Sequence, residues 1–97
     1  MTKRISIQVM GKVQGVYFRR DTQIEAQRLG LSGSVKNLPD SSVFIEAEGS
    51  DEKLEEFVKW CTQGPELANV SEILVSELSL KEDTSFEVLA KKEDFLS

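Results

Sequence analysis

The chain has 97 residues, of which 39% are apolar and 30% charged, as expected for a single globular domain with one two-layer core. Its net charge is −5 and its Lys and Arg residues form no basic stripe, so we expect no nucleic-acid partner. Histidine is absent and Cys61 is the only cysteine, which excludes Ser-His catalysis, His-ligated metal sites and an internal disulfide.

Apolar periodicity predicts the elements of the first half of the chain. Alternation predicts a strand over residues 4–10, and a loop with two glycines follows it. Apolar residues at helical spacing predict a helix over 18–29 that ends at Gly30. Residues 31–38 and 43–48 predict two strands joined by a turn, which makes a hairpin. The residues that carry the first two patterns are Ile5, Ile7 and Val9 in the strand, and Phe18, Thr22, Ala26 and Leu29 in the helix.

The second half predicts a helix and two strands. Ser50 or Asp51 caps a helix that ends at Gly64 and Pro65. A long strand is predicted over 70–80 and a short edge strand over 86–89, followed by a frayed charged tail at about 90–97. The apolar stripe of this helix consists of Leu54, Phe57, Val58 and Cys61.

The predicted order of elements is strand, helix, strand, strand, helix, strand. This is the α+β, ferredoxin-like βαββαβ plan, a two-layer sandwich of one antiparallel sheet with two helices on one face. We therefore expect one domain over residues 1–97. Many unrelated activities share this plan, so the function has to be argued from particular residues.

The loop between the first strand and the first helix carries the chemistry. Successive backbone N–H groups in a glycine-containing loop can converge on an anion, and the helix dipole adds to the attraction. Gly15 allows a left-handed backbone, and Arg19 could make a bidentate contact with phosphate oxygens. The residues alone also allow a different interpretation, because such loops are common and an arginine near a helix start is often only solvated.

Three sequence stretches resemble the acylphosphatase family. Residues 11–19 read GKVQGVYFR, which matches the family form G-x-V-Q-G-V-x-F-R at every defined position. Residues 33–43 and 60–65 are similar to two further family regions, and the likeness runs from the first strand to Val88. Two residues depart from the family: Ser34 replaces an aromatic residue, and Ser41 replaces a glycine in the hairpin turn.

The resemblance implies an activity and a set of site residues. It implies a metal-independent hydrolase, without cofactor or covalent intermediate, that converts small-molecule acyl phosphates (carboxyl-phosphate anhydrides) to a carboxylate and inorganic phosphate, with phosphate as product and inhibitor. It assigns Arg19 and Asn37 as catalytic residues. The phosphate-binding loop that it implies consists of Gly15, Val16, Tyr17, Phe18 and Arg19.

Several alternatives remain open at this point. The domain could be a non-catalytic module that binds a partner or an anion, or an RNA-binding module, although the first predicted strand offers no aromatic residue for base stacking. Family-like units also occur in larger carbamoyl-transfer proteins of hydrogenase maturation, but this sequence ends after one unit, so we expect a stand-alone enzyme. We also expect it to be a monomer. No segment could span a bilayer or act as a signal peptide, so we expect a cytoplasmic protein.

Other residues that could carry chemistry are assigned structural roles. Cys61 lies on the apolar stripe of the second helix and is expected in the core rather than as a nucleophile. Trp60 is expected to be half-buried packing beside that stripe, and Arg20 a surface charge. The acidic residues between 51 and 56 are expected to form a solvated helix face rather than a metal site.

Overall fold

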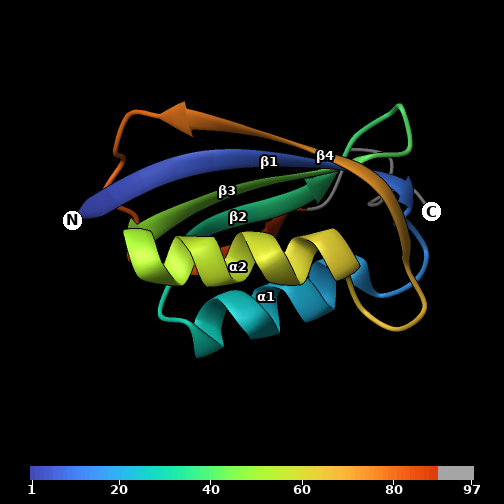
Figure 1. The fold of residues 1–97 in the computed structure, drawn as a ribbon, viewed down its shortest axis with the longest axis horizontal. Coiled ribbons are helices and arrows are strands. Elements are labelled where there is room, and N and C mark those ends of the chain that lie inside the picture. The colour runs from blue at the N-terminus through green and yellow to red at the C-terminus, as the bar shows by residue number, and fades with distance from the viewer. Residues whose placement is uncertain (90–97) are drawn as a thin grey trace.

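The computed structural model describes residues 1–89, which form two helices packed on one face of a five-stranded sheet (Figure 1). The elements are β1 (Thr2–Lys12), α1 (Phe18–Arg28), β2 (Ser32–Asn37), β3 (Val43–Ser50), α2 (Asp51–Gln63), β4 (Asn69–Leu78) and β5 (Phe86–Leu89). The tail predicted at 90–97 lies outside the described residues. Neither of the two helices in the described part has the length and apolar character that crossing a bilayer requires.

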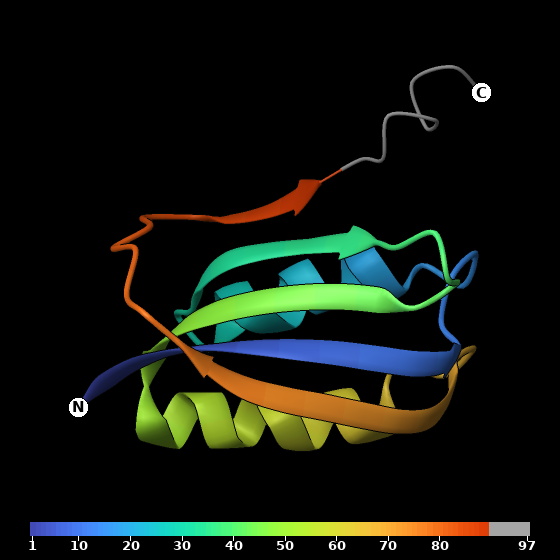
Figure 2. The same cartoon turned by 90° about the horizontal axis from the view of Figure 1, so that it is seen from above.

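The strands lie in the order β4-β1-β3-β2-β5, which confirms the predicted ferredoxin-like plan (Figure 2). Strands β1 to β4 pair only antiparallel, but β5 pairs parallel to β2, so the sheet is mixed rather than purely antiparallel as predicted. The reason is the path of the chain. Strand β4 ends at the end of the sheet where β2 begins, so a strand that starts there runs in the same direction as β2.

The core lies between the sheet and the two helices. Alternate residues of β1, β2 and β3 point into it, and the predicted stripes of α1 and α2 cover them. Ile24, which lies off the stripe of α1, is 57% exposed, and Cys61 is fully buried, as the periodicity predicts. The fully buried strand residues are Ile7, Val9, Val35, Val43, Ile45 and Ala47.

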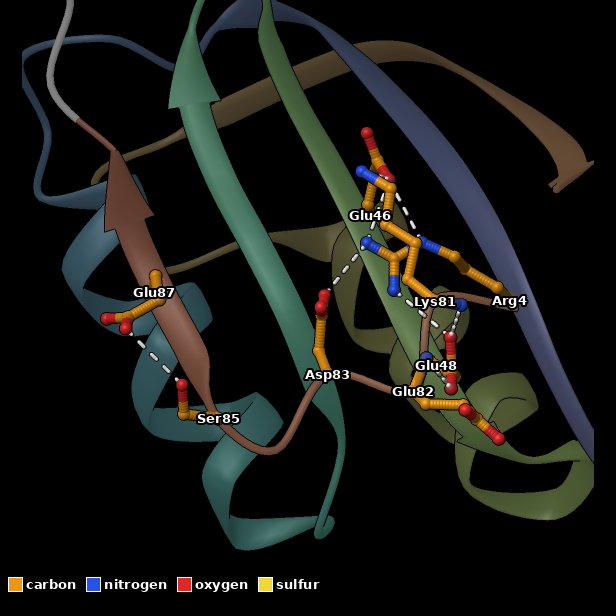
Figure 3. Close-up of polar contacts among 8 residues, drawn as sticks. All are labelled: Arg4, Glu46, Glu48, Lys81, Glu82, Asp83, Ser85 and Glu87. Atoms are coloured by element: carbon orange, nitrogen blue, oxygen red, sulfur yellow. Dashed lines mark hydrogen bonds and ion pairs between the residues drawn. The ribbon is translucent and has the colours of Figure 1, made fainter. Parts of the chain in front are cut away.

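A buried ionic cluster holds the crossover from β4 to β5. Arg4 is only 2% exposed although it lies on the face of the sheet opposite the helices, because residues of the crossover cover it (Figure 3). Its guanidinium forms ion pairs with Glu48 at 3.1 Å and with Asp83 of the crossover at 3.1 Å. Glu48 also accepts hydrogen bonds from the backbone N–H groups of Lys81 and Glu82 at 2.9 and 3.0 Å. These contacts fix the segment that directs β5 along β2 toward the opposite end of the sheet (Figure 2).

Candidate active site

The loop between β1 and α1 is held to the core by apolar side chains. Val13, Val16 and Phe18 are buried, and the Phe18 ring lies 5.8 Å from the Trp60 ring, centroid to centroid. Residues between these anchors take left-handed backbone conformations, with φ of 73° at Gly15 and 61° at Tyr17. A left-handed backbone costs a residue other than glycine about 1–2 kcal/mol. The strain at Tyr17 therefore indicates that the surrounding structure imposes the shape of the loop.

The backbone N–H groups of this loop are open to a ligand. Those of Gly15, Val16, Tyr17 and Phe18 have no acceptor among the described residues. The side chain of Tyr17, the N-cap residue of α1, makes no capping hydrogen bond, whereas Ser50 caps α2 by accepting a hydrogen bond from the Lys53 N–H. Uncapped N–H groups at a helix start attract an anion through hydrogen bonding and the helix dipole. We call residues 15–19 the anion loop.

Arg19 lies in the first turn of α1 and is half-buried. Its Nη1 donates a hydrogen bond of 3.1 Å to the backbone carbonyl of Leu89, the last residue of β5. One turn further along α1, Gln23 Nε2 donates to the carbonyl of Phe86 at 2.9 Å. Helix α1 and strand β5 are therefore joined by two side chains, and these contacts orient the guanidinium at the helix start.

Asn37 is the last residue of β2 and precedes the turn that leads to β3. The turn is closed by hydrogen bonds from the Ser41 N–H to the Leu38 carbonyl at 3.2 Å and from the Leu38 N–H to the Ser42 carbonyl at 2.8 Å. The Oδ1 atom of Asn37 is buried and has no hydrogen-bond partner in the described part of the chain. A buried polar atom without a partner costs about 1–3 kcal/mol, so Oδ1 is suited to accept a hydrogen bond from a bound molecule.

One pocket of about 530 Å³ brings the predicted site residues together. It is lined by Val13, Gly15, Tyr17, Phe18, Arg19, Arg20, Gln23, Asn37 and Val88. Both predicted catalytic residues and all predicted loop residues except Val16 line it, and Val16 is buried in the core. The sequence did not predict that Gln23 and Val88 line the pocket, because β5 has to lie beside α1 before the two residues come near the site.

Arg20 lies at this pocket as well, although the sequence predicted only a surface charge. It is exposed, and its guanidinium lies 4.6 Å from the centroid of the Tyr17 ring. Both Nε and Nη2 of Arg20 donate to Oδ1 of Asp21 at 3.2 Å. Arg20 is thus engaged by a ring and a carboxylate of the same chain.

The remaining candidate residues do not line this pocket. The thiol of Cys61 is fully buried on α2, and burial raises its pKa far above the ordinary value, so it is not a thiolate nucleophile. Ser34 does not line the pocket and pairs with Glu46 and Glu87 on neighbouring strands. Within residues 1–89, no three His, Cys, Asp or Glu side chains are grouped as the ligands of a metal ion would be.

The fold and this site define a ferredoxin-like α+β domain with open backbone N–H groups in the loop before α1. A family model described as Acylphosphatase matches residues 5–88. An acylphosphatase of Marinobacter nauticus is 49% identical over 79 residues, which are 80% of this chain and 86% of that protein. The crystal structure of acylphosphatase from Bacillus subtilis is 39% identical with a TM-score of 0.87, and the match covers 92% of this chain and 99% of that one. This chain therefore belongs to the acylphosphatase family.

A similar unit also occurs within a longer protein. The crystal structure of T. kodakarensis HypF matches 94% of this chain with 32% identity and a TM-score of 0.80. The matched part is only 12% of the HypF chain, whereas the match covers nearly all of the Bacillus subtilis protein. The same fold thus occurs both as nearly a whole chain and as one part of a larger chain.

Proposed function

We propose that this protein hydrolyses acyl phosphates to a carboxylate and inorganic phosphate in the pocket between the anion loop and Asn37. The observation that carries the proposal is the gathering of three features in one pocket of a family member: open backbone N–H groups, Arg19, and the unpartnered Oδ1 of Asn37. Each has a separate part in the reaction.

The anion loop and Arg19 bind the phosphoryl group. Phosphoryl transfer passes through a loose transition state in which negative charge is spread over the phosphoryl oxygens, so positioning and electrostatic stabilisation do most of the catalysis. N–H groups from Gly15 to Phe18 and the Arg19 guanidinium can donate to these oxygens. The hydrogen bond to the Leu89 carbonyl holds the Arg19 guanidinium at the start of α1 before substrate binds. A donor that is already in place needs less reorganisation to stabilise the transition state.

Asn37 orients the attacking water. Its Oδ1 accepts a hydrogen bond from the water, whose oxygen then bonds to phosphorus as the bond between phosphorus and the acyl oxygen breaks. The carboxylate leaves with that electron pair, and the water's proton passes to an oxygen of the phosphoryl group. A carboxylate is a good leaving group and needs no strong general acid, which is consistent with a chain that has no histidine.

The direct test is hydrolysis of benzoyl phosphate by the purified protein in the presence of EDTA. We expect phosphate release well above the blank, no gain on adding a divalent metal, and competitive inhibition by inorganic phosphate, which fits the same donors. Release equal to the blank would favour the alternative function, a non-catalytic domain that binds an anion or a partner.

We also expect the protein to act as a monomer in the cytoplasm. A chain with a single cysteine needs no oxidising compartment for disulfide formation, which is consistent with the cytoplasm. Size-exclusion chromatography with light scattering would test the monomer, and fractionation of the source cells would test the compartment.

A further inference from the structure

Gln14 immediately precedes the anion loop and reaches across to the hairpin between β2 and β3. Its Nε2 donates one hydrogen bond to the Leu38 carbonyl at 2.9 Å and one to the Ser42 carbonyl at 2.8 Å. A primary amide has two N–H bonds, so these contacts use both of its donors. Gln14 is half-buried, which keeps the pair of bonds partly shielded from competing water.

The two carbonyls that accept from Gln14 already close the turn. The Leu38 carbonyl also accepts from the Ser41 N–H, and the Ser42 carbonyl also accepts from the Leu38 N–H. The turn therefore remains closed without Gln14. What the side chain adds is a connection between two separate segments, 24 and 28 residues apart in sequence.

This connection links two segments, one next to the anion loop and the other next to Asn37. Gln14 is bonded to Gly15 of the anion loop, and Leu38 is bonded to Asn37. The two segments lie at the same end of the sheet (Figure 2), and none of the helices and strands described within residues 1–89 spans them there. Attack on phosphorus requires the water and the phosphoryl group to lie in line, and a misplacement of about 1 Å can cost on the order of 10²-fold in rate.

We propose that Gln14 is a positioning residue, which sets the place of Asn37 relative to the anion loop and so aligns the attacking water with the bound phosphoryl group. This inference rests on the proposed function. It assigns Gln14 no contact with substrate, since it acts through the backbone of the hairpin.

The chain offers a matched control in Gln8. Its Nε2 donates to the same hairpin, to Ser42 Oγ at 3.1 Å and Asp40 Oδ2 at 3.3 Å, but Gln8 belongs to β1 and not to the loop. Gln8 thus supports the side chains of the hairpin without connecting it to the anion loop. Loss of Gln8 should affect stability alone.

The experiment compares Gln14→Met and Gln8→Met with the wild type on benzoyl phosphate. Methionine keeps the length of glutamine and removes both donors. For Gln14→Met we expect kcat to fall by about 10–10²-fold while the phosphate inhibition constant changes less than about threefold, because the phosphate ligands are intact. Gln8→Met should keep kcat within about threefold of the wild type. If Gln14→Met does not fold, Gln14→Asn replaces it, because the shorter amide cannot reach both carbonyls.

A double-mutant cycle with Asn37→Ala separates positioning from other effects. If Gln14 acts by placing Asn37, the Gln14 change should cost little further kcat once the Asn37 side chain is gone. The inference is overturned if kcat is unchanged in the Gln14 variant, if the loss is as large in the Asn37→Ala background, or if the phosphate inhibition constant rises as steeply as kcat falls. A wild type without activity would instead refute the proposed function.

Discussion

Nη1 of Arg19 donates a hydrogen bond of 3.1 Å to the backbone carbonyl of Leu89, so the last residue of β5 orients a side chain at the start of α1. The two residues are 70 positions apart in sequence. This hydrogen bond depends on the path of the segment between β4 and β5. The ionic cluster around Arg4 holds that segment and so directs β5 along β2 toward the anion loop. The arginine assigned to phosphate binding is thus positioned by the C-terminal strand of the described fold.

Replacing Arg19 should nearly abolish turnover. Arg19→Gln removes a charge-assisted contact that tightens in the transition state, a loss worth about 3–4 kcal/mol or on the order of 10²–10³ in rate. The phosphate inhibition constant should rise as well, because the guanidinium also binds the ground state. Kinetics on benzoyl phosphate with increasing inorganic phosphate would measure both effects.

Arg20→Gln is the control for this prediction. Arg20 lies at the same pocket, but its guanidinium is bonded to Asp21 and lies over the Tyr17 ring, so the variant should keep most of the activity. Equal losses in the two variants would show that the phosphate-binding arginine is wrongly assigned.

Most of the fold could be predicted because local signals agree with one another. The stripes of both helices, the cap at Ser50 and the turn before β3 all depend on residues close together in the sequence. The site could be predicted only in part. Arg19 and Asn37 lie in motifs that resemble a family, and the structure then places both at one pocket.

The missed features are contacts between distant segments. The sequence pattern places Gln14 in a loop but cannot show that its amide reaches the carbonyls of residues 38 and 42. The same holds for Arg4, an arginine in a half-buried strand that would ordinarily be solvated. The parallel pairing of β5 was missed because a run of four residues carries no information on the direction of its neighbour.

Ser41→Gly should stabilise the protein. Ser41 has φ of 75°, a left-handed conformation that costs a side-chain residue roughly 1 kcal/mol more than glycine. A gain of that size would raise the melting temperature by about 4–8 °C in a domain of this length. Ser41→Ala is the matched control, because it removes the hydroxyl but keeps the Cβ and should give no gain. Thermal unfolding followed by circular dichroism compares the two, and a lower melting temperature for the glycine variant would contradict the prediction.

Cys61→Ala should retain full activity and lose some stability. The thiol is fully buried on the core side of α2, so truncation leaves a small cavity at a cost of roughly 1–2 kcal/mol. Cys61→Ser should be less stable than the alanine variant, because it buries a hydroxyl among apolar side chains. Loss of turnover in a folded alanine variant would mean that the thiol takes part in the reaction.

Acid should destabilise the protein partly through Glu48. Hydrogen bonds from the Lys81 and Glu82 N–H groups and the ion pair with Arg4 hold the pKa of the Glu48 carboxyl below its ordinary value of 4.5, although burial opposes this. A lowered pKa means that the stabilisation is fully present above about pH 4.5 and is lost as the pH falls through the folded-state pKa.

Urea unfolding between pH 7 and pH 3 tests this role of Glu48. Glu48→Gln should be less stable than the wild type at pH 7, because Arg4 is left with a buried charge and fewer partners, and it should lose less on acidification. Glu55→Gln removes the same charge from an exposed position on α2 and should keep the wild-type acid sensitivity. Parallel curves for the wild type and Glu48→Gln would exclude Glu48 as the titrating group.

Asn37→Ala should lower kcat by orders of magnitude and leave phosphate affinity nearly unchanged. In the proposed function Arg19 and the N–H groups of the anion loop bind the phosphate, and both remain when the amide is removed, so phosphate binding should survive. What is lost is the group that orients water, which matters mainly in the transition state. The variant should fold, because the turn after β2 is closed by backbone hydrogen bonds and Oδ1 of Asn37 has no hydrogen-bond partner in the described structure.

Asn37→Asp distinguishes water positioning from phosphate binding. It keeps the shape of the side chain but places a negative charge at the pocket, so it should both slow turnover and weaken phosphate binding through like-charge repulsion. The two variants therefore differ in the phosphate inhibition constant and not only in kcat. If Asn37→Ala raises that constant as steeply as Arg19→Gln does, Asn37 is a phosphate ligand. If neither kcat nor the inhibition constant changes in the alanine variant, Asn37 only shapes the strand end, and the water must be oriented by another group at the pocket.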